Sequence, residues 1–304
     1  MLSFFFIVLG IGLLYLGGEL LVRYASSLAL RFNLSPLVIG LTVVAFGTSA
    51  PELAATLAAS LSGASAIGIG NVIGSNTSNL GLILGLCAII LPLAGQGVLR
   101  RELPIMLFVS LLPFFWFWNG SMGRLDGLIG VSLLISYLIW TFRTAPAEAN
   151  DLDKPHIAPL WLTLIGILGG LTLLVLGAQV LVEGASTLAR AMGVPEKVIG
   201  LTLVAVGTSL PELASSVVAI IKRQTDLVLG NIIGSNIFNI LGILGISSLV
   251  KSLPLSFELI RFDLIVMLGF ALLTSLFLLS RKQLVRWEGG VLMAGYMGYI
   301  VYLF

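Results

Sequence analysis

The chain has 304 residues, of which 58% are hydrophobic and only 10% are charged. A soluble domain carries about 25% charged residues, so this composition excludes a soluble enzyme, a nucleic-acid-binding protein and a disordered regulator. The net charge of +2 implies no strongly anionic partner. One cysteine and one histidine exclude an intrachain disulfide and a zinc site with several His and Cys ligands. The composition predicts an integral membrane protein.

Ten apolar segments are candidate membrane-spanning helices, each of which needs about 20 mostly apolar residues. They fall near residues 2–22, 36–60, 66–92, 103–118, 126–142, 160–181, 196–221, 226–250, 260–279 and 287–304. No charged segment precedes the first one, so we expect a retained span rather than a cleaved signal peptide. Nothing in the sequence predicts a strand, because a β-barrel shows alternation instead of long unbroken apolar runs.

The chain repeats itself at an offset of 160 residues. Residues 38–54 read VIGLTVVAFGTSAPELA and residues 198–214 read VIGLTLVAVGTSLPELA, with fourteen of seventeen positions identical. Each copy holds five predicted spans, and an odd number makes the second copy enter the membrane inverted. The sequence therefore predicts an all-α polytopic membrane protein with ten transmembrane helices. They form two inverted five-helix repeats, 1–142 and 160–304, joined by a linker at 143–159.

The distribution of Lys and Arg among the short loops predicts the orientation of the chain. If the N-terminus is outside, the cytoplasmic loops hold eleven of the sixteen basic residues and the outer loops hold five. We therefore expect both termini outside the cell. The linker is then cytoplasmic, and it is too short to contain a folded regulatory domain.

Two carboxylates, Glu52 and Glu212, lie deep inside predicted spans at equivalent places in the two repeats. An ionised side chain at this depth is costly, so each is a functional candidate. Because all Lys and Arg fall in loops or at span ends, the counter-charge must be a proton or a mobile metal ion. Glu19 lies near the end of the first span beside Arg23, and we expect it to be interfacial, without a ligand role.

Oxygen-bearing side chains surround each glutamate. A proline before each acid removes a backbone donor, which frees carbonyls near Gly47 and Gly207 and loosens those of Ala45 and Ala205. Helical spacing places a threonine and a serine on the face of each acid. These hydroxyl residues are Thr48 and Ser49 in the first repeat, and Thr208 and Ser209 in the second. The alternative interpretation is a proline kink held by hydroxyl groups that bond to the backbone.

A second pair of segments adds further polar groups. Residues 70–79, GNVIGSNTSN, and residues 230–239, GNIIGSNIFN, agree at seven of ten positions. In these segments Ser75 and Asn79 share one helix face, as do Ser235 and Asn239. The glycines favour close helix packing. The remaining asparagines favour hydrogen bonds between helices rather than a ligand role; they are Asn71, Asn76, Asn231 and Asn236.

The combined site contains carboxylates, hydroxyls, amides and carbonyls, without imidazole or thiolate. Such oxygen ligands suit Ca²⁺, Mg²⁺ or Na⁺ and disfavour zinc or copper. Two carboxylates balance one divalent cation and also attract two or three Na⁺ ions. A site that holds either ion in turn is what an exchanger requires.

The segments GTSAPE at 47–52 and GTSLPE at 207–212, with the two GNxxGSNxxN segments, resemble the paired repeats of the sodium/calcium exchanger family. The compact length resembles its prokaryotic members. The resemblance implies ten helices and four ion sites between the repeats. It implies four Ca²⁺ ligands, which are Glu52, Glu212, Thr48 and Thr208. At the Na⁺ sites it implies Ser49, Ser209, Ser75, Ser235 and the carbonyls of Ala45 and Ala205. It places Asn79 and Asn239 in the middle of the ion cluster. Some relatives carry aspartate at position 239, so Asn239 argues against K⁺ co-transport.

These features predict a secondary-active antiporter in a prokaryotic cytoplasmic membrane that moves Ca²⁺ out against Na⁺ entry. We expect no enzyme activity, no cofactor besides the transported ions, and no nucleic-acid or protein partner, which is compatible with a monomer. A Ca²⁺/H⁺ exchanger of the same fold is the nearest alternative. An ion channel, an intramembrane protease with two acids, and an antiporter for Mg²⁺ or another cation are further alternatives.

Overall fold

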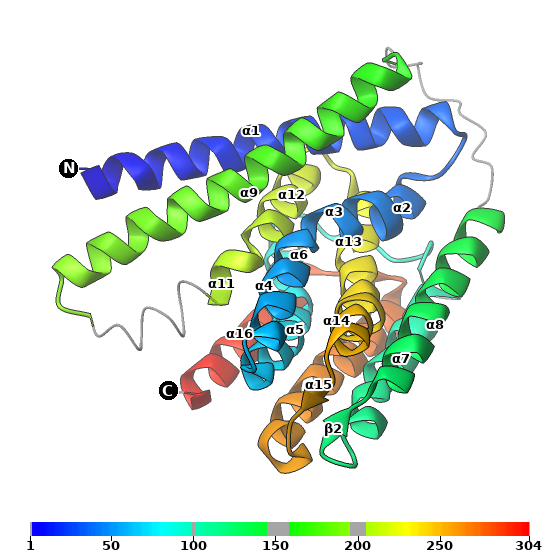
Figure 1. Cartoon of the computed structure of the whole chain (residues 1–304). Helices are drawn as coiled ribbons and strands as arrows, with labels where there is room; N and C mark the ends of the chain where they lie inside the picture. Colours follow the sequence, from blue (N-terminus) through cyan, green and yellow to red (C-terminus); the bar gives the residue numbers. More distant parts are fainter. Residues whose placement is uncertain (1, 99–100, 145–157, 195–204, 304) are drawn as a thin grey trace.

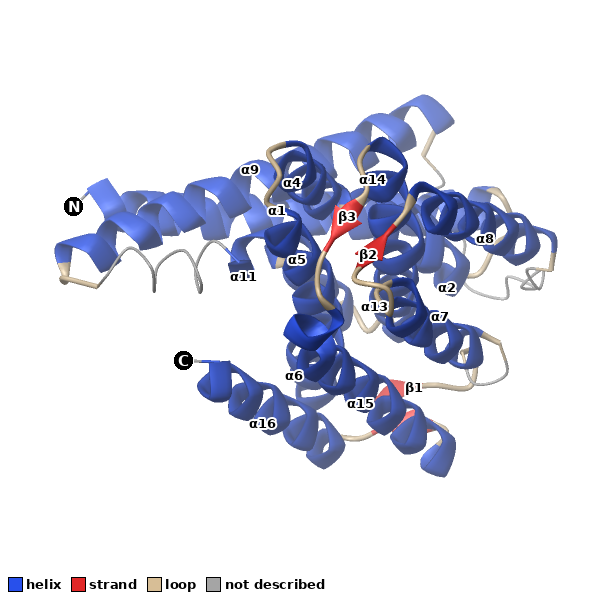
Figure 2. Cartoon of the chain, turned by 60° about the horizontal axis from the view of Figure 1, so that its bottom comes forward, coloured by secondary structure: helices blue, strands red, loops and turns tan. Residues whose placement is uncertain are grey.

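The computed structural model describes residues 2–98, 101–144, 158–194 and 205–303, and these ranges are mostly helical (Figures 1 and 2). The elements of the first half are α1 (Leu2–Arg31), α2 (Pro36–Ile39), η1 (Gly40–Val44), α3 (Ala45–Thr48), α4 (Ala50–Leu61), α5 (Ser65–Ser78), η2 (Asn79–Ile83), α6 (Leu84–Ile90), β1 (Leu93–Ala94), α7 (Glu102–Trp116), β2 (Ser121–Met122) and α8 (Arg124–Arg143). Those of the second half are α9 (Leu160–Ala191), α11 (Ala205–Thr208), α12 (Leu210–Ile221), α13 (Thr225–Phe238), η4 (Asn239–Leu244), α14 (Gly245–Val250), β3 (Leu253–Pro254), α15 (Phe257–Arg281), β4 (Gln283–Leu284) and α16 (Arg286–Leu303).

Several of these helices are long and apolar enough to cross a membrane. Within the described residues six meet that test, and the bent pair Pro36–Thr48 and Ala50–Leu61 makes up to seven. Helices α7 and α12 are apolar but shorter. Each predicted span coincides with helical structure in its described part, while residues 196–204 of the seventh lie outside the described ranges. The protein is therefore a helical membrane protein with several apolar spans.

The most deeply buried helices are those that carry the repeated asparagine motifs. The most apolar window of residues 225–250 is completely buried, whereas only a third of the corresponding window of α1 is buried. Large apolar side chains on the outer helices are exposed, among them Phe5 on α1, Leu125 on α8 and Ile165 on α9. This distribution suits a bundle whose periphery faces lipid, because lipid tails solvate apolar side chains.

Helices α1 and α9 lie side by side across one end of the bundle (Figure 1). Glycines allow their backbones to approach closely. A Cβ atom at Gly17 would lie 2.7 Å from the backbone nitrogen of Leu174, and one at Gly177 would lie 2.7 Å from that of Leu14. Small residues at such contacts are what membrane helices use to pack without a hydrophobic driving force.

The structure contains four short strands, so the prediction of no strand is wrong. Strand β1 pairs antiparallel with β4, and β2 pairs antiparallel with β3. Each pair joins one half of the chain to the other half. The strands have only two residues and lie in the loops between helices, where the hydrophobic pattern carries no strand signal.

Glu19 makes a contact that the sequence did not predict. Its carboxylate forms an ion pair with Lys222, at 2.5 Å. Nearby, the hydroxyl of Ser26 donates to Gln224 Oε1 at 2.8 Å. Both contacts join α1 to the loop that follows α12. Residues 145–157 of the predicted linker lie outside the described residues.

Candidate ion-binding site

Glu52 and Glu212 occupy equivalent places at the N-terminal ends of two helices. Each is the third residue of its helix, α4 or α12, and their side chains have relative exposures of 0% and 1%. Free N–H groups and the helix dipole favour negative charge at this end of a helix. No Lys or Arg forms an ion pair with either acid within the described part of the chain. A bound cation therefore fits the charge of the site.

The helices break directly before these two glutamates. Ser49, with φ −83° and ψ 3°, separates α3 from α4, and Ser209, with φ −88° and ψ 3°, separates α11 from α12. Pro51 has no amide hydrogen, so the carbonyl of Gly47 loses its usual helical donor. The two parts of the first broken helix differ in direction by 43°. The predicted proline breaks thus place each glutamate in a first helical turn.

The carbonyl of Ala45 keeps its helical hydrogen-bond donor. It accepts the backbone N–H of Ser49 at 3.1 Å, and a carbonyl oxygen has a second lone pair that can meet an ion. Proline at position 51 removes the donor to Gly47, and Ser49 keeps its own N–H. The corresponding Ala205 is the first residue of α11, immediately after residues outside the described ranges.

Each glutamate accepts a hydrogen bond from the serine of the opposite repeat. Ser49 Oγ donates to Glu212 Oε1 at 3.0 Å, and Ser209 Oγ is 3.3 Å from Glu52 Oε1. The two contacts are equivalent at the offset of 160 residues. Ser209 Oγ also lies 3.1 Å from the hydroxyl of Ser75 on α5. The two broken helices therefore form one site, in which each half of the chain supports the carboxylate of the other half.

The threonines and two asparagines form a second reciprocal set. Thr48 Oγ1 lies 3.2 Å from Asn231 Oδ1, and Thr208 Oγ1 lies 3.2 Å from Asn71 Oδ1. The carbonyl of Val44, at 3.0 Å, competes with Asn231 for the single hydrogen of the Thr48 hydroxyl. The asparagine amides then donate to hydroxyls on the neighbouring helix, with Asn71 bonding to Thr56 at 3.1 Å and Asn231 to Ser215 at 3.3 Å and Ser216 at 3.1 Å. These asparagines bridge helices, as their sequence context favoured. A threonine hydroxyl oxygen also carries two lone pairs, which are the groups that can meet an ion.

Asn79 and Asn239 each begin a π-helical segment, η2 or η4. The amide of Asn239 donates to Asn76 Oδ1 at 2.9 Å, and that of Asn76 donates to the carbonyl of Asn236 at 3.1 Å. Asn236 itself bonds within its own helix, to the carbonyl of Ile232. Wider turns of this kind are frequent at functional sites because they shift the direction of the side chains that follow. The π-helical turns were not predicted. They extend over only five and six residues, and the hydrophobic pattern of so short a segment does not distinguish a π-helix from an α-helix.

Several buried oxygen atoms of the predicted ligands have no hydrogen-bond partner among the described residues. They are Glu52 Oε2, Asn79 Oδ1, Glu212 Oε2, Ser235 Oγ and Asn239 Oδ1. Buried polar atoms are normally paired, so such a group requires an explanation. Ca²⁺ and Na⁺ take carboxylate, amide and hydroxyl oxygens as ligands. No cluster of three or more His, Cys, Asp or Glu occurs in the described ranges, so the available donors fit a hard cation better than zinc.

The sequence predicted the central residues of this site but missed the second layer. Thr56, Ser215 and Ser216 were not expected to contribute, yet all three accept hydrogen bonds from the bridging asparagines. Thr56 and Ser216 are equivalent at the offset of 160, and each is a small polar residue in an apolar helix. That recurrence is the signal that would have identified them.

Comparison with known families gives an independent result. The model of the family described as sodium/calcium exchanger protein matches residues 2–143 and 162–304. The chain belongs to the sodium/calcium exchanger family. This family consists of transporters, and its two matched segments correspond to the two halves that contribute to the site.

Individual relatives are similar over nearly the whole chain. The sodium/calcium exchanger MaX1 of Methanosarcina acetivorans is 34% identical, with 100% of this chain and 99% of that protein covered. The inner membrane protein YrbG of Escherichia coli is 35% identical, with 98% and 94% covered. The structure of the sodium-calcium exchanger NCX_Mj soaked with zero Na⁺ and Ca²⁺ has a TM-score of 0.88 and 36% identity, and covers 100% of this chain and 99% of its own.

Proposed function

We propose that this protein is a secondary-active antiporter that exchanges Na⁺ for Ca²⁺ by alternating access. The observation that supports this most strongly is the reciprocal pair of hydrogen bonds between Ser49 and Glu212 and between Ser209 and Glu52. An ion held by these carboxylates contacts both halves of the chain. Transporters built from inverted repeats bind their substrates at the interface of the repeats, near the middle of the membrane. Membership of the family supports the same conclusion.

The two carboxylates give the site a charge of −2. This charge balances one Ca²⁺ or attracts two or three Na⁺, so the two kinds of ion compete and do not occupy the site together. The proposed Ca²⁺ ligands are Glu52, Glu212, Thr48 and Thr208, the proposed Na⁺ ligands are Ser49, Ser209, Ser75, Ser235 and the carbonyls of Ala45 and Ala205, and Asn79 and Asn239 lie between them. The empty site resists closure, because two dehydrated carboxylates without a counter-ion are costly.

We infer ten membrane-spanning helices in two inverted repeats, 1–142 and 160–304, with both termini outside a prokaryotic cytoplasmic membrane. Access changes when α1 and α9 slide together over the rest of the bundle. Their glycine-rich contact supports movement as one unit, since the backbones touch closely along it. The chain functions by itself, with the bilayer, Ca²⁺ and Na⁺ as its partners. Asn239 provides no third acid, which favours exchange without K⁺.

A Ca²⁺/H⁺ exchanger with the same fold is the alternative. The observation that favours it is the presence of two buried acids whose Oε2 atoms have no partner in the described chain, since such groups can carry protons. The alternative predicts Ca²⁺ flux that follows a pH gradient and does not require Na⁺. Mg²⁺ as the transported ion would use the same oxygen ligands but would require shorter, octahedral coordination.

The proposed roles are tested by Ca²⁺ uptake into Na⁺-loaded proteoliposomes. Glu52→Gln and Glu212→Gln should each abolish uptake, while the proteins still purify as folded monodisperse species. Glu19→Gln is the matched control, since it makes the same chemical change in an ion pair near the surface. Full exchange by either site variant would refute the assignment of the two glutamates.

A further inference from the structure

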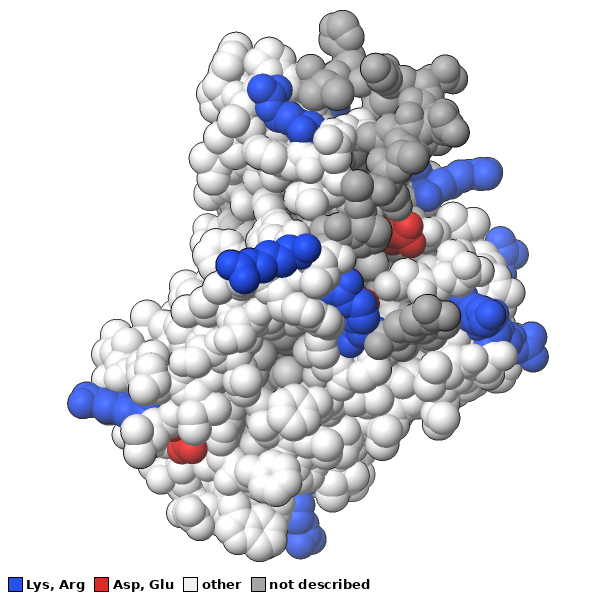
Figure 3. Space-filling model, turned by 90° about the vertical axis from the view of Figure 1, so that its right-hand side faces the viewer, with Lys and Arg blue, Asp and Glu red and all other residues white. Residues whose placement is uncertain are grey.

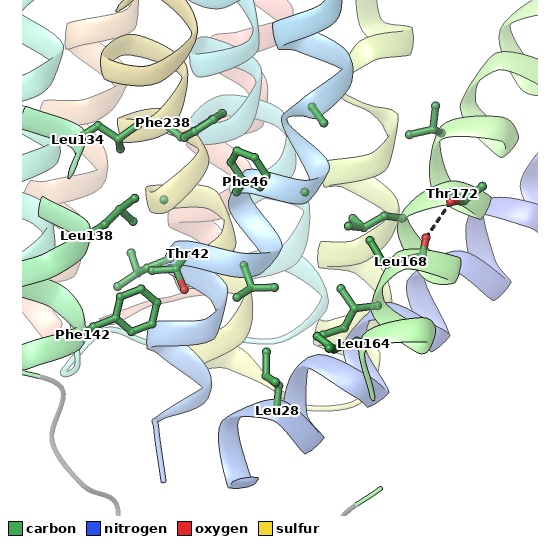
Figure 4. Close-up of a pocket in the computed structure, with 18 of the residues that line it drawn as sticks. Leu28, Thr42, Phe46, Leu134, Leu138, Phe142, Leu164, Leu168, Thr172 and Phe238 are labelled. Atoms are coloured by element: carbon green, nitrogen blue, oxygen red, sulfur yellow. Dashed lines mark hydrogen bonds between the residues drawn. The ribbon is translucent and has the colours of Figure 1, made fainter. Parts of the chain in front are cut away.

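An apolar cavity lies between α9 on one side and α8 with η1 and α3 on the other (Figure 4). Its volume is about 870 Å³. No charged residue lines it, and its polar lining residues are Thr42, Tyr137, Thr172 and Gln179. The two threonine hydroxyls bond to their own helices. Thr42 donates to the carbonyl of Val38 at 2.7 Å, and Thr172 donates to that of Leu168 at 2.8 Å. The cavity therefore offers an apolar surface to whatever occupies it.

The cavity opens at the side of the bundle. Five of its large apolar lining residues are strongly exposed; the relative exposure is 64% for Leu168, 58% for Phe46 and 46% for each of Leu164, Phe142 and Leu176. Leu164 and Leu168 belong to α9, one of the helices long and apolar enough to cross a membrane. Water binds poorly in such a space because it needs two to four polar partners. Because α9 is long and apolar enough to cross a membrane, we expect lipid chains beside this opening, and an alkyl chain matches the cavity in chemistry and in access.

Basic side chains lie near one end of the cavity. That end is marked by Leu28 and Phe142 in Figure 4. Arg31 follows Leu28 by three residues on α1, and Arg143 directly follows Phe142 on α8. The C-terminal ends of α1 and α8 lie on the same side of the molecule (Figure 1), and several Lys and Arg side chains, separated by uncharged surface, are visible on that face (Figure 3). Basic pockets between membrane helices bind the head groups of anionic lipids.

We propose that this cavity binds one acyl chain of an anionic phospholipid, whose phosphate lies near Arg31 and Arg143. The chain packs against Phe46 and Gly47, immediately before the break at Ser49. Leu171 of α9 already reaches this place, since a Cβ at Gly47 would lie 2.6 Å from Leu171 Cδ1. A bound chain fills the space between α9 and the wall of the ion site. Its effect on exchange, by opposing movement of α9, rests on the proposed function, whereas the binding of the lipid does not.

The binding is tested by native mass spectrometry of the purified protein in detergent, with phosphatidylglycerol and phosphatidylcholine supplied in equal amounts. Wild-type protein should retain one phosphatidylglycerol. Leu168→Trp fills the cavity and should lower this retention at least tenfold, as should Leu138→Trp from the opposite wall. Ile165→Trp is the control, because Ile165 lies on the same helix, is 59% exposed and does not line the cavity.

The basic end has its own matched pair of variants. Arg143→Gln should lower phosphatidylglycerol retention about fivefold. This factor corresponds to the attraction between one basic side chain near the membrane surface and anionic lipid head groups. Arg124→Gln, at the other end of α8, should leave it unchanged. Equal retention by the Leu168 and Ile165 variants, or no preference for phosphatidylglycerol over phosphatidylcholine, would overturn the proposal. Because lipid retention is counted without transport, its failure is distinguishable from a failure of the proposed exchange.

Discussion

Replacing Glu52 by glutamine should weaken Ca²⁺ binding much more than Na⁺ binding. The carboxylate is completely buried, and its Oε1 accepts one hydrogen bond, from Ser209. At an effective dielectric constant of about 20, one pair of unit charges about 4 Å apart contributes about 4 kcal/mol, and a divalent ion doubles this to about 8 kcal/mol. The amide oxygen of glutamine remains a ligand and offsets part of the loss.

With about 1.4 kcal/mol for each tenfold change, we expect the affinity for Ca²⁺ to fall by at least about 1,000-fold. The fold-loss of Na⁺ affinity should be roughly the square root of the fold-loss of Ca²⁺ affinity, because the charge of Na⁺, and with it the lost interaction energy, is half as large. Thermal unfolding of the purified protein, titrated with each ion, measures both affinities, since a ligand that binds the folded state raises the unfolding temperature. Glu19→Gln should leave both titrations unchanged. A Glu52→Gln protein that keeps its Ca²⁺ affinity within tenfold, or that loses more Na⁺ affinity than Ca²⁺ affinity, would refute this reasoning.

Three further predictions concern stability, measured as the unfolding temperature in detergent. Gly17→Ala should destabilise the protein by about 1–3 kcal/mol, because the new Cβ would meet a backbone nitrogen at 2.7 Å. Gly12→Ala, with open space around it, should not destabilise the protein. Equal unfolding temperatures of the two variants would contradict the close contact of α1 and α9. Asn231→Ala should lower the free energy of unfolding by about 1–3 kcal/mol, because it leaves the hydroxyls of Thr48 and Ser216 without this partner. Asn119→Ala, at an exposed site, should change it by no more than about 0.5 kcal/mol. An Asn231 variant as stable as the wild type would rule out the bridging role. Lys222→Gln should change stability by no more than about 1 kcal/mol, since the pair with Glu19 is about a third exposed, and a larger loss would mean that this contact is more than a surface ion pair.

The central residues of the site could be predicted from the sequence because membrane burial leaves few explanations for an acid. Glu52 and Glu212 stood out as charged residues in apolar spans without a basic partner, and the structure buries both completely. The proline breaks were predicted for the same local reason, since proline cannot donate a backbone hydrogen bond wherever it lies. Both inferences depend on a few neighbouring residues.

The features that were not predicted depend on contacts between distant residues. The pairing of Ser49 with Glu212 requires the two broken helices to face each other, and no local pattern expresses that. The short strands depend on which loops meet, such as Leu93 opposite Leu284. The partner of the Ala45 carbonyl depends on the exact residue at which the helix breaks, which is Ser49.

Na⁺-coupled Ca²⁺ exchange is tested most directly by Ca²⁺ uptake into proteoliposomes loaded with Na⁺, K⁺ or choline at equal and fixed pH on both sides. The account predicts uptake from the Na⁺-loaded vesicles alone, and abolition of that uptake when the Na⁺ gradient is removed. Equal uptake from all three loads that varies with an imposed pH gradient would contradict Na⁺ coupling and favour the proton-coupled alternative.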